Sequence, residues 1–231
     1  MKYNKIGIIC AMEKEAEGIL SAMEEKESHS VGSLAFYTGR IGEKEVVLAI
    51  CGIGKVFAAM CAEAMTLSFR PQCIITSGVA GSLTEKLDIL SLAVSESLVQ
   101  HDMDTSPLGD PIGLISGINK VFLPADKPLA QEVLRLAEEE KIPAAAGVIA
   151  SGDRFIAKEE DKMRLKTLFD PIACEMEGAA IAQVCFANKI PFCVIRTISD
   201  SFHGDNAMDY AEFSRRAALQ GAQFLVKLLK K

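Results

Sequence analysis

The chain has 231 residues, of which 49% are apolar, and it carries a net charge of −6. A chain of this length can bury one good core, so we expect a single domain over residues 1–231. Its 25 basic residues are outnumbered by 31 acidic ones and form no basic stripe, which argues against nucleic acid as a partner.

The first apolar run, residues 6–12, meets the charged Glu13 too early for a signal peptide. No segment reaches the roughly 18 consecutive apolar residues of a membrane helix. We therefore expect a cytoplasmic protein without a membrane partner. The seven cysteines form no CxxC pair and lie mostly in apolar runs, which favours reduced core thiols over a zinc site.

The first third predicts a strand and a helix, followed by a hairpin and a second helix. Residues 4–12 are a β-rich apolar run, and the apolar residues from Ala16 to Met23 recur at spacings of three and four, as on a helix. A polar stretch at 24–32 follows, with no element assigned. The hairpin strands and the second helix are predicted at 34–37, 45–50 and 55–68.

The middle third combines two strands with a long irregular loop. The run at 73–76 predicts a strand that ends in a glycine-rich turn at 77–82, and another strand is expected at 89–99. Residues 101–120 are rich in Gly, Pro, Asp and Ser and lack periodicity. Loops of this length are usually functional or mobile. A helix follows at 128–140.

The last third alternates between strand and helix. Strands are predicted at 145–151, 171–174 and 191–198, and helices at 158–169, 177–188 and 209–230. This alternation is typical of an α/β protein with a mainly parallel sheet covered by helices on both faces. The early hairpin makes the sheet mixed.

Polar residues just after apolar runs are the candidate site residues, because ligands of α/β sheets collect beyond the carboxyl ends of the strands. Glu15 shares a helix side with Ile19, which turns it inward, whereas Glu13 and Glu17 belong to another face. An inward Glu15 fits a functional carboxylate. A first-turn carboxylate that stabilises the helix dipole explains it equally well.

Two charged clusters flank buried strands in the last third. Glu175 and Glu177 surround Met176 where charge is costly unless it is paired or used, so a functional role is favoured. Asp200 ends a hydrophobic strand, which suits a general acid, although an N-cap role is an alternative. Arg196 lies inside the same strand and needs a carboxylate partner, for which Glu175 or Glu177 is the candidate.

Three other segments carry weaker signals. The turn at 77–82 lacks the spacing of a Walker loop or a dinucleotide fingerprint. Phe155 follows a polar turn and would either stack on a flat ring or join the core. His101, Asp102 and Asp104 have no partners elsewhere in the sequence pattern, which is more typical of a solvated or subunit-contact loop, so we assign no metal.

Taken together, these segments resemble one family, the 5'-methylthioadenosine/S-adenosylhomocysteine nucleosidases of the nucleoside phosphorylase superfamily. Each segment alone is a weak signal, but six in the same order are specific. The matching segments are 6–15, 52–55, 77–81, 151–156, 175–177 and 196–200.

The resemblance implies a nucleoside phosphorylase-like fold of three αβα layers, a homodimer, no cofactor, and hydrolysis of an adenine nucleoside to adenine and a thioribose. Asp200 would protonate adenine N7, and Glu15 would activate the attacking water. Because bond cleavage builds an oxocarbenium-like ribosyl cation, the leaving base needs a proton and the sugar needs nearby carboxylates. Asp200 would therefore need a raised pKa, while Glu15 stays ionised.

The resemblance also implies binding roles. Glu177 would hold the ribose hydroxyls, and Met176 would pack against the sugar. Phe155 would stack on adenine, whose edge the Ile156 backbone would read. The other residues implied at the substrate site are Ile53, Ala80, Gly81, Glu175, Arg196, Ser199 and Tyr210, the last as an aromatic lid.

The chain departs from the family pattern in two places. Val79 stands where family members often have serine, which removes one hydroxyl near the catalytic centre. The loop from His101 to Gly117 resembles the segment that lends apolar residues across the dimer to the 5'-alkylthio pocket. Thr105 and Leu108 occupy those places here, so the preferred 5'-group stays open.

Three alternatives remain at this point. A purine nucleoside phosphorylase shares the fold but needs cations for phosphate, usually Arg, whereas the first turn offers Glu15. An aminodeoxyfutalosine hydrolase would use nearly the same residues. A non-catalytic nucleoside-binding protein would retain Phe155 and Glu177 but lose Glu15 or Asp200. Both of these carboxylates are present, which favours an enzyme.

Overall fold

The computed structural model describes residues 1–203 and 206–231, with only the backbone described at 206–208. The strands are β1 (Lys5–Cys10), β2 (Glu24–Val31), β3 (Leu34–Ile41), β4 (Lys44–Ile50), β5 (Cys73–Ser82), β6 (Leu92–Gln100), β7 (Leu123–Pro124), β8 (Ala144–Ser151), β9 (Ala173–Glu175) and β10 (Phe192–Asp200). The α-helices are α1 (Glu13–Ala22), α2 (Lys55–Phe69), α3 (Lys127–Glu139), α4 (Glu159–Phe169), α5 (Gly178–Ala187) and α6 (Asn206–Leu229).

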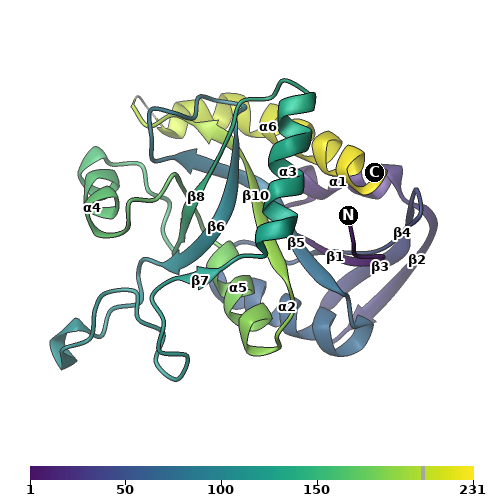
Figure 1. The fold of residues 1–231 in the computed structure, drawn as a ribbon, viewed down its shortest axis with the longest axis horizontal. Helices are drawn as coiled ribbons and strands as arrows, with labels where there is room; N and C mark the ends of the chain where they lie inside the picture. The colour runs from purple at the N-terminus through teal and green to yellow at the C-terminus, as the bar shows by residue number, and fades with distance from the viewer. Residues whose placement is uncertain (204–205) are drawn as a thin grey trace.

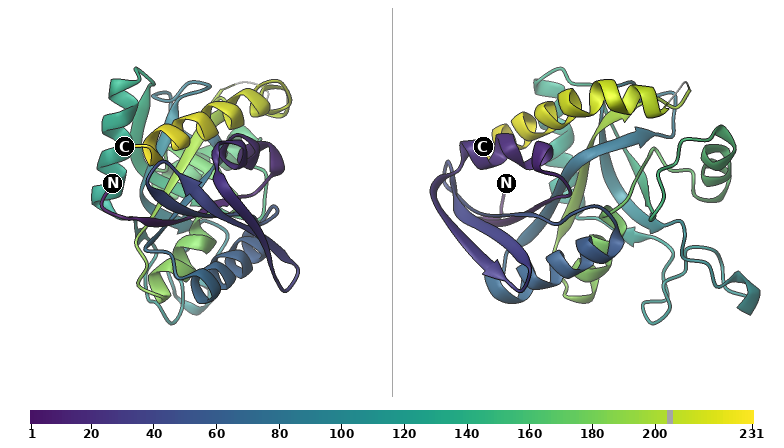
Figure 2. Two further views of the ribbon diagram at one scale, coloured as in Figure 1. Left: turned by 90° about the vertical axis from the view of Figure 1, so that its right-hand side faces the viewer. Right: turned by 180° about the vertical axis from the view of Figure 1, so that it is seen from behind.

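A mixed sheet forms the middle layer, and helices cover both of its faces (Figure 1). Helices α2 and α5 pack on one face through buried residues such as Cys61 and Ile181. Helices α1, α3 and α6 cover the other face, with Ile19 and Val133 in its core. Figure 2 shows α6 running beside α1 across this face. The predicted three-layer α/β fold with its mixed sheet is confirmed.

One part of the sheet closes on itself, which the alternation of elements does not predict. Strand β10 pairs in parallel with β5 and antiparallel with β6, while β8 and β9 complete a ring back to β5. Strands β1, β4, β3 and β2 continue outward from β5. Because β1, β5 and β10 run parallel, their carboxyl ends meet at one edge of the sheet.

The polar stretch after the first helix is a strand, contrary to the absence of an element expected from the sequence. Residues 24–31 form β2, which pairs antiparallel with β3 at the edge of the sheet. Most of its residues are exposed. Sequence periodicity detects a strand through one buried apolar face, and a charged edge strand has none.

The glycine-rich turn predicted at 77–82 is also wrong, because β5 continues through these residues. Its register places Gly78 opposite Arg196 and Gly81 opposite Asp200. A Cβ atom at Gly81 would lie 2.5 Å from Asp200 Oδ2, and one at Gly78 would lie 2.6 Å from Glu15 Oε1. The glycines therefore mark where large polar side chains lie against the strand.

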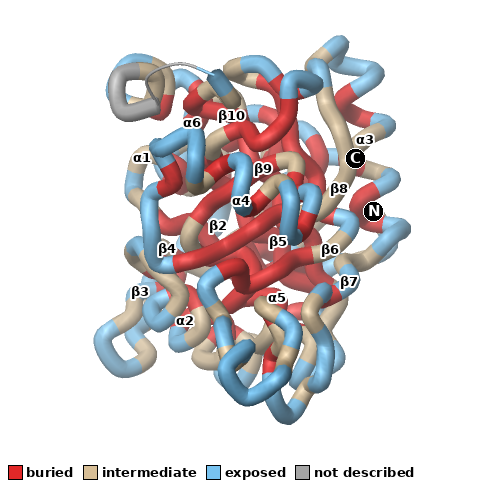
Figure 3. Tube along the Cα trace, turned by 90° about the vertical axis from the view of Figure 1, so that its left-hand side faces the viewer, coloured by how far each residue is buried: buried red, intermediate tan, exposed pale blue. Residues whose placement is uncertain are grey.

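The irregular loop predicted at 101–120 is confirmed, with one short 3₁₀ turn at Ser106–Leu108. The loop projects from the body between β6 and β7 (Figures 1 and 2). Figure 3 shows the buried strands surrounded by exposed loops and helix faces. The predicted burial of the seven cysteines is confirmed. Over the described ranges, no helix is long and apolar enough to cross a membrane.

Candidate active site

A cavity of about 290 Å³ lies where the carboxyl ends of β1, β5, β9 and β10 come together. Most residues of the substrate site predicted from the sequence line it, namely Glu15, Ile53, Ala80, Gly81, Phe155, Glu175, Met176, Glu177, Ser199, Asp200 and Tyr210. Sequence reasoning did not assign a role to Ala11, Met12 and Cys174, which also line the cavity beside Val79.

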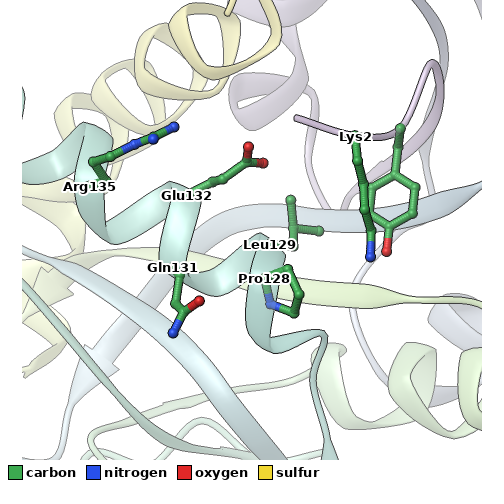
Figure 4. A pocket seen from close by; sticks show the side chains of 7 residues that line it. Lys2, Pro128, Leu129, Gln131, Glu132 and Arg135 are labelled. Atoms are coloured by element: carbon green, nitrogen blue, oxygen red, sulfur yellow. The ribbon is translucent and has the colours of Figure 1, made fainter.

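Another cavity of about 290 Å³ lies between the N-terminal residues and α3 (Figure 4). Its lining consists of Lys2, Tyr3, Pro128, Leu129, Gln131, Glu132 and Arg135. None of these residues belongs to the segments that the sequence analysis singled out, so we place the candidate active site in the first cavity.

Glu15 points inward from the first turn of α1, as predicted, and is only 2% exposed. Its Oε2 accepts the backbone N–H groups of Ala11 (2.9 Å) and Met12 (3.0 Å), and its Oε1 accepts that of Val79 (3.0 Å). Burial raises the pKa of Glu15, whereas nearby Arg196 and the three N–H donors oppose the rise. Both oxygens are acceptors here, which is the bonding pattern of an ionised carboxylate.

Asp200 is the last residue of β10 and is 2% exposed. A bulge in the pairing of β10 with β5 falls between Ile198 and Asp200, and bulges of this kind re-aim a side chain. The Ser199 hydroxyl donates to Asp200 Oδ1 at 2.8 Å. The next helix begins only at Asn206, so Asp200 is not its N-cap.

Arg196 is fully buried and pairs with both carboxylates that the sequence suggested. It forms an ion pair with Glu175 and another, at 3.4 Å, with Glu177. These carboxylates raise the pKa of Arg196 even though its burial acts in the opposite direction. Arg196 does not line the cavity but lies behind residues that do, so its contact with a substrate would be indirect.

Glu175 mainly holds its own surroundings together. It accepts the Ser151 hydroxyl and the backbone N–H groups of Glu177 (3.1 Å) and Gly178 (2.8 Å). Among the described residues, the carboxylate of Glu177 accepts one backbone donor, Gly54 N–H, at 2.9 Å. Burial and the neighbouring Glu175 raise the pKa of Glu177 to about 7. Glu177 is therefore the carboxylate of this pair with capacity left for a ligand.

Two aromatic side chains form one wall of the cavity. The rings of Phe155 and Tyr210 meet edge to face, with centroids 5.5 Å apart. Phe155 is 49% exposed, so the interpretation of it as a core residue is wrong. The Lys14 ammonium lies 4.8 Å from the centroid of the Tyr210 ring, and the Tyr210 hydroxyl contacts Met12 Sδ at 3.6 Å.

Besides Arg196, three predicted site residues lie outside this cavity. Ile156 borders a smaller adjoining hollow of about 30 Å³, which Gly81, Met176 and Asp200 also line. Thr105 and Leu108 lie on the projecting loop, where Leu108 is 83% exposed. Within one chain, the structure does not bring these two residues to the cavity.

The expectation that His101, Asp102 and Asp104 lie in a solvated or subunit-contact loop is wrong for His101, and the expectation that they have no partners elsewhere is wrong for Asp102. His101 is buried. Asp102 binds the Lys55 ammonium at 2.6 Å and the backbone N–H of Asp153 at 2.9 Å. The partners are 47 and 51 residues away along the chain, so local spacing carried no signal for them. The bond from the Ser151 hydroxyl to Glu175 was not predicted either, because these residues are 24 positions apart.

The charged side chains that line the cavity are all acidic, and Arg196 behind them pairs with two of the four. Glu15, Glu175, Glu177 and Asp200 line it, and the described part of the chain contributes no Lys, Arg or His to the lining. A surface of this kind attracts positive charge, such as that of an oxocarbenium-like sugar, and disfavours a phosphate anion.

Comparison with known proteins identifies the same family that the sequence resembles. The family model for the phosphorylase superfamily matches residues 5–230. The chain is 35% identical over 225 residues to the 5'-methylthioadenosine/S-adenosylhomocysteine nucleosidase of Staphylococcus aureus (strain JH9), covering 97% of this chain and 98% of that protein.

Two solved structures from Helicobacter pylori are similar over nearly their whole length. A mutant 5'-methylthioadenosine/S-adenosylhomocysteine nucleosidase with 5'-methylthioadenosine in its active site superimposes with a TM-score of 0.93 at 37% identity, covering 99% of this chain and 98% of that one. A futalosine hydrolase superimposes with a TM-score of 0.92 at 37% identity, covering 98% and 97%. The chain belongs to the 5'-methylthioadenosine/S-adenosylhomocysteine nucleosidase family of the phosphorylase superfamily.

Proposed function

We propose that this protein hydrolyses the N-glycosidic bond of 5'-methylthioadenosine and S-adenosylhomocysteine, releasing adenine and the 5-thioribose product. The observation that carries the proposal is the pair of buried carboxylates, Glu15 and Asp200, which line one cavity from different elements. Membership of the nucleosidase family supports the same reaction.

Asp200 is the proton donor in this proposal. The adenine anion is a poor leaving group, and protonation of N7 lets adenine leave as a neutral base. An acid must therefore lie beside the base. Asp200 lies in a nearly water-free position between Ser199 and Gly81, and the Ser199 hydroxyl orients one of its oxygens. The other oxygen then carries the proton toward the base. The Ile156 backbone and the backbone of Ala80 and Gly81 complete the base site.

Glu15 is the base that activates water. Three backbone N–H groups fix its carboxylate and support the ionised form. As the glycosidic bond lengthens, positive charge grows on the ribosyl ring, and the carboxylates around the cavity stabilise that charge. Water attacks the cation and gives its proton to Glu15.

The remaining residues position the nucleoside. Glu177 accepts the ribose hydroxyls, and Met176 provides a soft apolar surface against the sugar. Phe155 stacks on adenine, and Tyr210 covers the mouth of the cavity beside it. Ile53 borders the sugar end of the site. Arg196 and Glu175 act behind this layer by holding Glu177 in place.

The test is adenine release from 5'-methylthioadenosine with and without phosphate, by wild type and Asp200→Asn. Equal release in both buffers, lost in the variant by about 10²–10⁴-fold, is the expected result. Release that requires phosphate would make the protein a phosphorylase. Binding of the nucleoside without release from any adenine nucleoside would support a binding protein.

Aminodeoxyfutalosine is a second candidate substrate, favoured by the 37% identity to the futalosine hydrolase. The comparison of kcat/KM for this nucleoside and 5'-methylthioadenosine on the same preparation decides between them. The substrate with the higher kcat/KM identifies the 5'-group for which the cavity is built.

We also propose a homodimer. The exposed face of α2 carries Val56 (70%), Met60 (48%) and Leu67 (65%) at helical spacing. The projecting loop, with Thr105 and Leu108, leaves the body close to the start of α2, because Asp102 binds Lys55. A second copy packed on this face would receive the loop near its own cavity, and Thr105 and Leu108 would then contact the 5'-group.

A further inference from the structure

A network centred on Asp102 joins two of the loops that border the cavity, and the mechanism above does not use it. Asp102 lies two residues after Gln100, the last residue of β6. Its Oδ1 accepts the Lys55 ammonium at 2.6 Å, and its Oδ2 accepts the backbone N–H of Asp153 at 2.9 Å. One carboxylate therefore binds both the start of α2 and the segment after β8.

The two residues bound by Asp102 also bind each other. The backbone N–H of Lys55 donates to Asp153 Oδ1 at 2.8 Å, which satisfies a free donor at the first turn of α2. The N-cap residue is Gly54, whose φ of 100° favours glycine and where a Cβ would lie 3.1 Å from the same oxygen. Asp102, Lys55 and Asp153 thus form a closed ring of three contacts.

The sheet fixes one side of this ring. Gln100 lies opposite Ser151 in the pairing of β6 with β8, and the backbone N–H of His101 donates to the Ser151 carbonyl at 3.0 Å. His101 is buried against Gly152, where a Cβ would lie 2.5 Å from the imidazole Cε1. Asp102 and Asp153 are therefore placed by the sheet, and through them the segment 52–55 is held to it.

The ring reaches the cavity through the neighbours of its members. Gly54 N–H donates to Glu177 Oε1 at 2.9 Å, so the orientation of that carboxylate depends on where the segment 52–55 lies. Ile53 lines the cavity on the same segment, and Phe155 lines it two residues after Asp153. The contacts of Asp102 thus bear on both the sugar side and the base side of the site.

We infer that Asp102 is a positioning residue for ribose recognition. It holds the segment 52–55 against the segment after β8, so that Gly54 N–H fixes Glu177 in the orientation that receives the ribose hydroxyls. This inference rests on the proposed function, in which Glu177 binds those hydroxyls. Partial burial opposes the charged form of Asp102, but Lys55 and the Asp153 N–H outweigh it and lower its pKa, so the carboxylate is ionised at neutral pH.

The first variant is Asp102→Asn, which keeps the size of the side chain but offers only one acceptor oxygen and no charge. We expect KM for 5'-methylthioadenosine to rise about tenfold, the equivalent of one charge-assisted hydrogen bond, while kcat changes less than about twofold. Lys55→Met removes the ammonium and leaves the backbone bond to Asp153, and it should shift KM in the same direction by less.

A comparison of two substrates separates positioning from general loss of structure. In wild type, removal of the ribose 3'-hydroxyl should lower kcat/KM strongly, because Glu177 loses its partner. In Asp102→Asn that penalty should shrink by about tenfold, because the carboxylate is no longer aimed at the hydroxyl. A variant that is only less well folded would lose activity on both substrates equally and keep the ratio unchanged.

Asp170→Asn is the matched control, since it removes the charge from an exposed ion pair with Lys166 that shares no residue with the ring, and asparagine tolerates the left-handed backbone of this helix C-cap. It should leave both KM and the substrate ratio unchanged. A wild-type ratio for the two substrates in Asp102→Asn, with a wild-type melting temperature, would overturn the inference. If Asp102→Asn does not fold, an unchanged ratio in Lys55→Met overturns it instead. Failure of wild type to release adenine would refute the proposed function rather than this inference.

Discussion

Burial of Glu15 shifts its pKa, and with it the pH range in which we expect hydrolysis. The residue must be ionised to accept a proton from water, and burial raises its pKa above its ordinary value of 4.5. Because the protonated form is inactive, kcat/KM should fall as the pH decreases through this raised pKa. A pH series of adenine release measures the midpoint, and an acidic limb at or below 4.5 would contradict the role.

The base itself is tested by Glu15→Gln, which keeps the size of the side chain and removes the charge. We expect kcat to fall by about 10²–10⁴-fold, while binding of a non-hydrolysed analogue is retained. Calorimetric titration with that analogue separates the two effects. Near-normal turnover in this variant would show that another group accepts the proton.

The absence of a side chain at Gly81 leaves the space that the Asp200 carboxylate occupies. A Cβ at this position would lie 2.5 Å from Asp200 Oδ2, closer than real Cβ contacts, so Gly81→Ala forces the carboxylate to turn. A misplaced catalytic group costs about 10²-fold in rate. Gly18→Ala is a matched control, because its Cβ would press on Ala222 in a helix contact instead. It should lower the melting temperature and leave kcat unchanged.

Strand β10 carries both the proposed acid, Asp200, and the buried Arg196, which is the counter-ion of Glu175 and Glu177. Arg196→Met would leave Glu175 and Glu177 buried without their counter-ion. Such a loss destabilises a fold by about 3–5 kcal/mol, measured as the free energy of unfolding in denaturant. The double variant Arg196→Met with Glu175→Gln should recover part of the loss. An unchanged free energy of unfolding for the single variant would refute this view of the pair.

The order of strands and helices was predictable wherever hydrophobic periodicity is strong. The helices at 128–140 and 158–169 and the last three strands lie within a few residues of the predicted ranges. The exceptions have physical reasons. Strand β2 has no buried face to reveal it, and β5 has glycines because Asp200 and Glu15 need the space above them.

In the candidate site too, the residues with a local sequence signal could be predicted, and those placed by long-range contacts could not. Glu15 and Asp200 could be predicted because a helix period and a strand end each act locally. The ring of Lys55, Asp102 and Asp153 could not, because it depends on contacts between loops far apart in the chain. The closure of β10 onto both β5 and β6 belongs to this second kind, since alternation of elements says nothing about which strands pair.

For the whole molecule, the exposed apolar residues of α2 and of the projecting loop have a common explanation. Single exposed apolar side chains are ordinary, but Val56, Met60 and Leu67 form a row on one helix face. Leu108 is 83% exposed at the tip of a loop that leaves the body beside that helix. In a homodimer, both features would be covered, and each cavity would gain apolar contacts from the other chain.

This arrangement predicts that assembly and substrate preference change together. The double variant Val56→Glu and Met60→Glu should be monomeric by light scattering, because it places charge in the apolar centre of the proposed interface. Its kcat/KM for 5'-methylthioadenosine should fall more than that for adenosine, since only the methylthio group would lose contacts with the partner's Leu108. Leu219→Glu, at an exposed apolar position on α6, should leave both properties unchanged. A monomeric wild type, or a monomeric variant with an unchanged ratio of the two substrates, would contradict a cavity completed by the second chain.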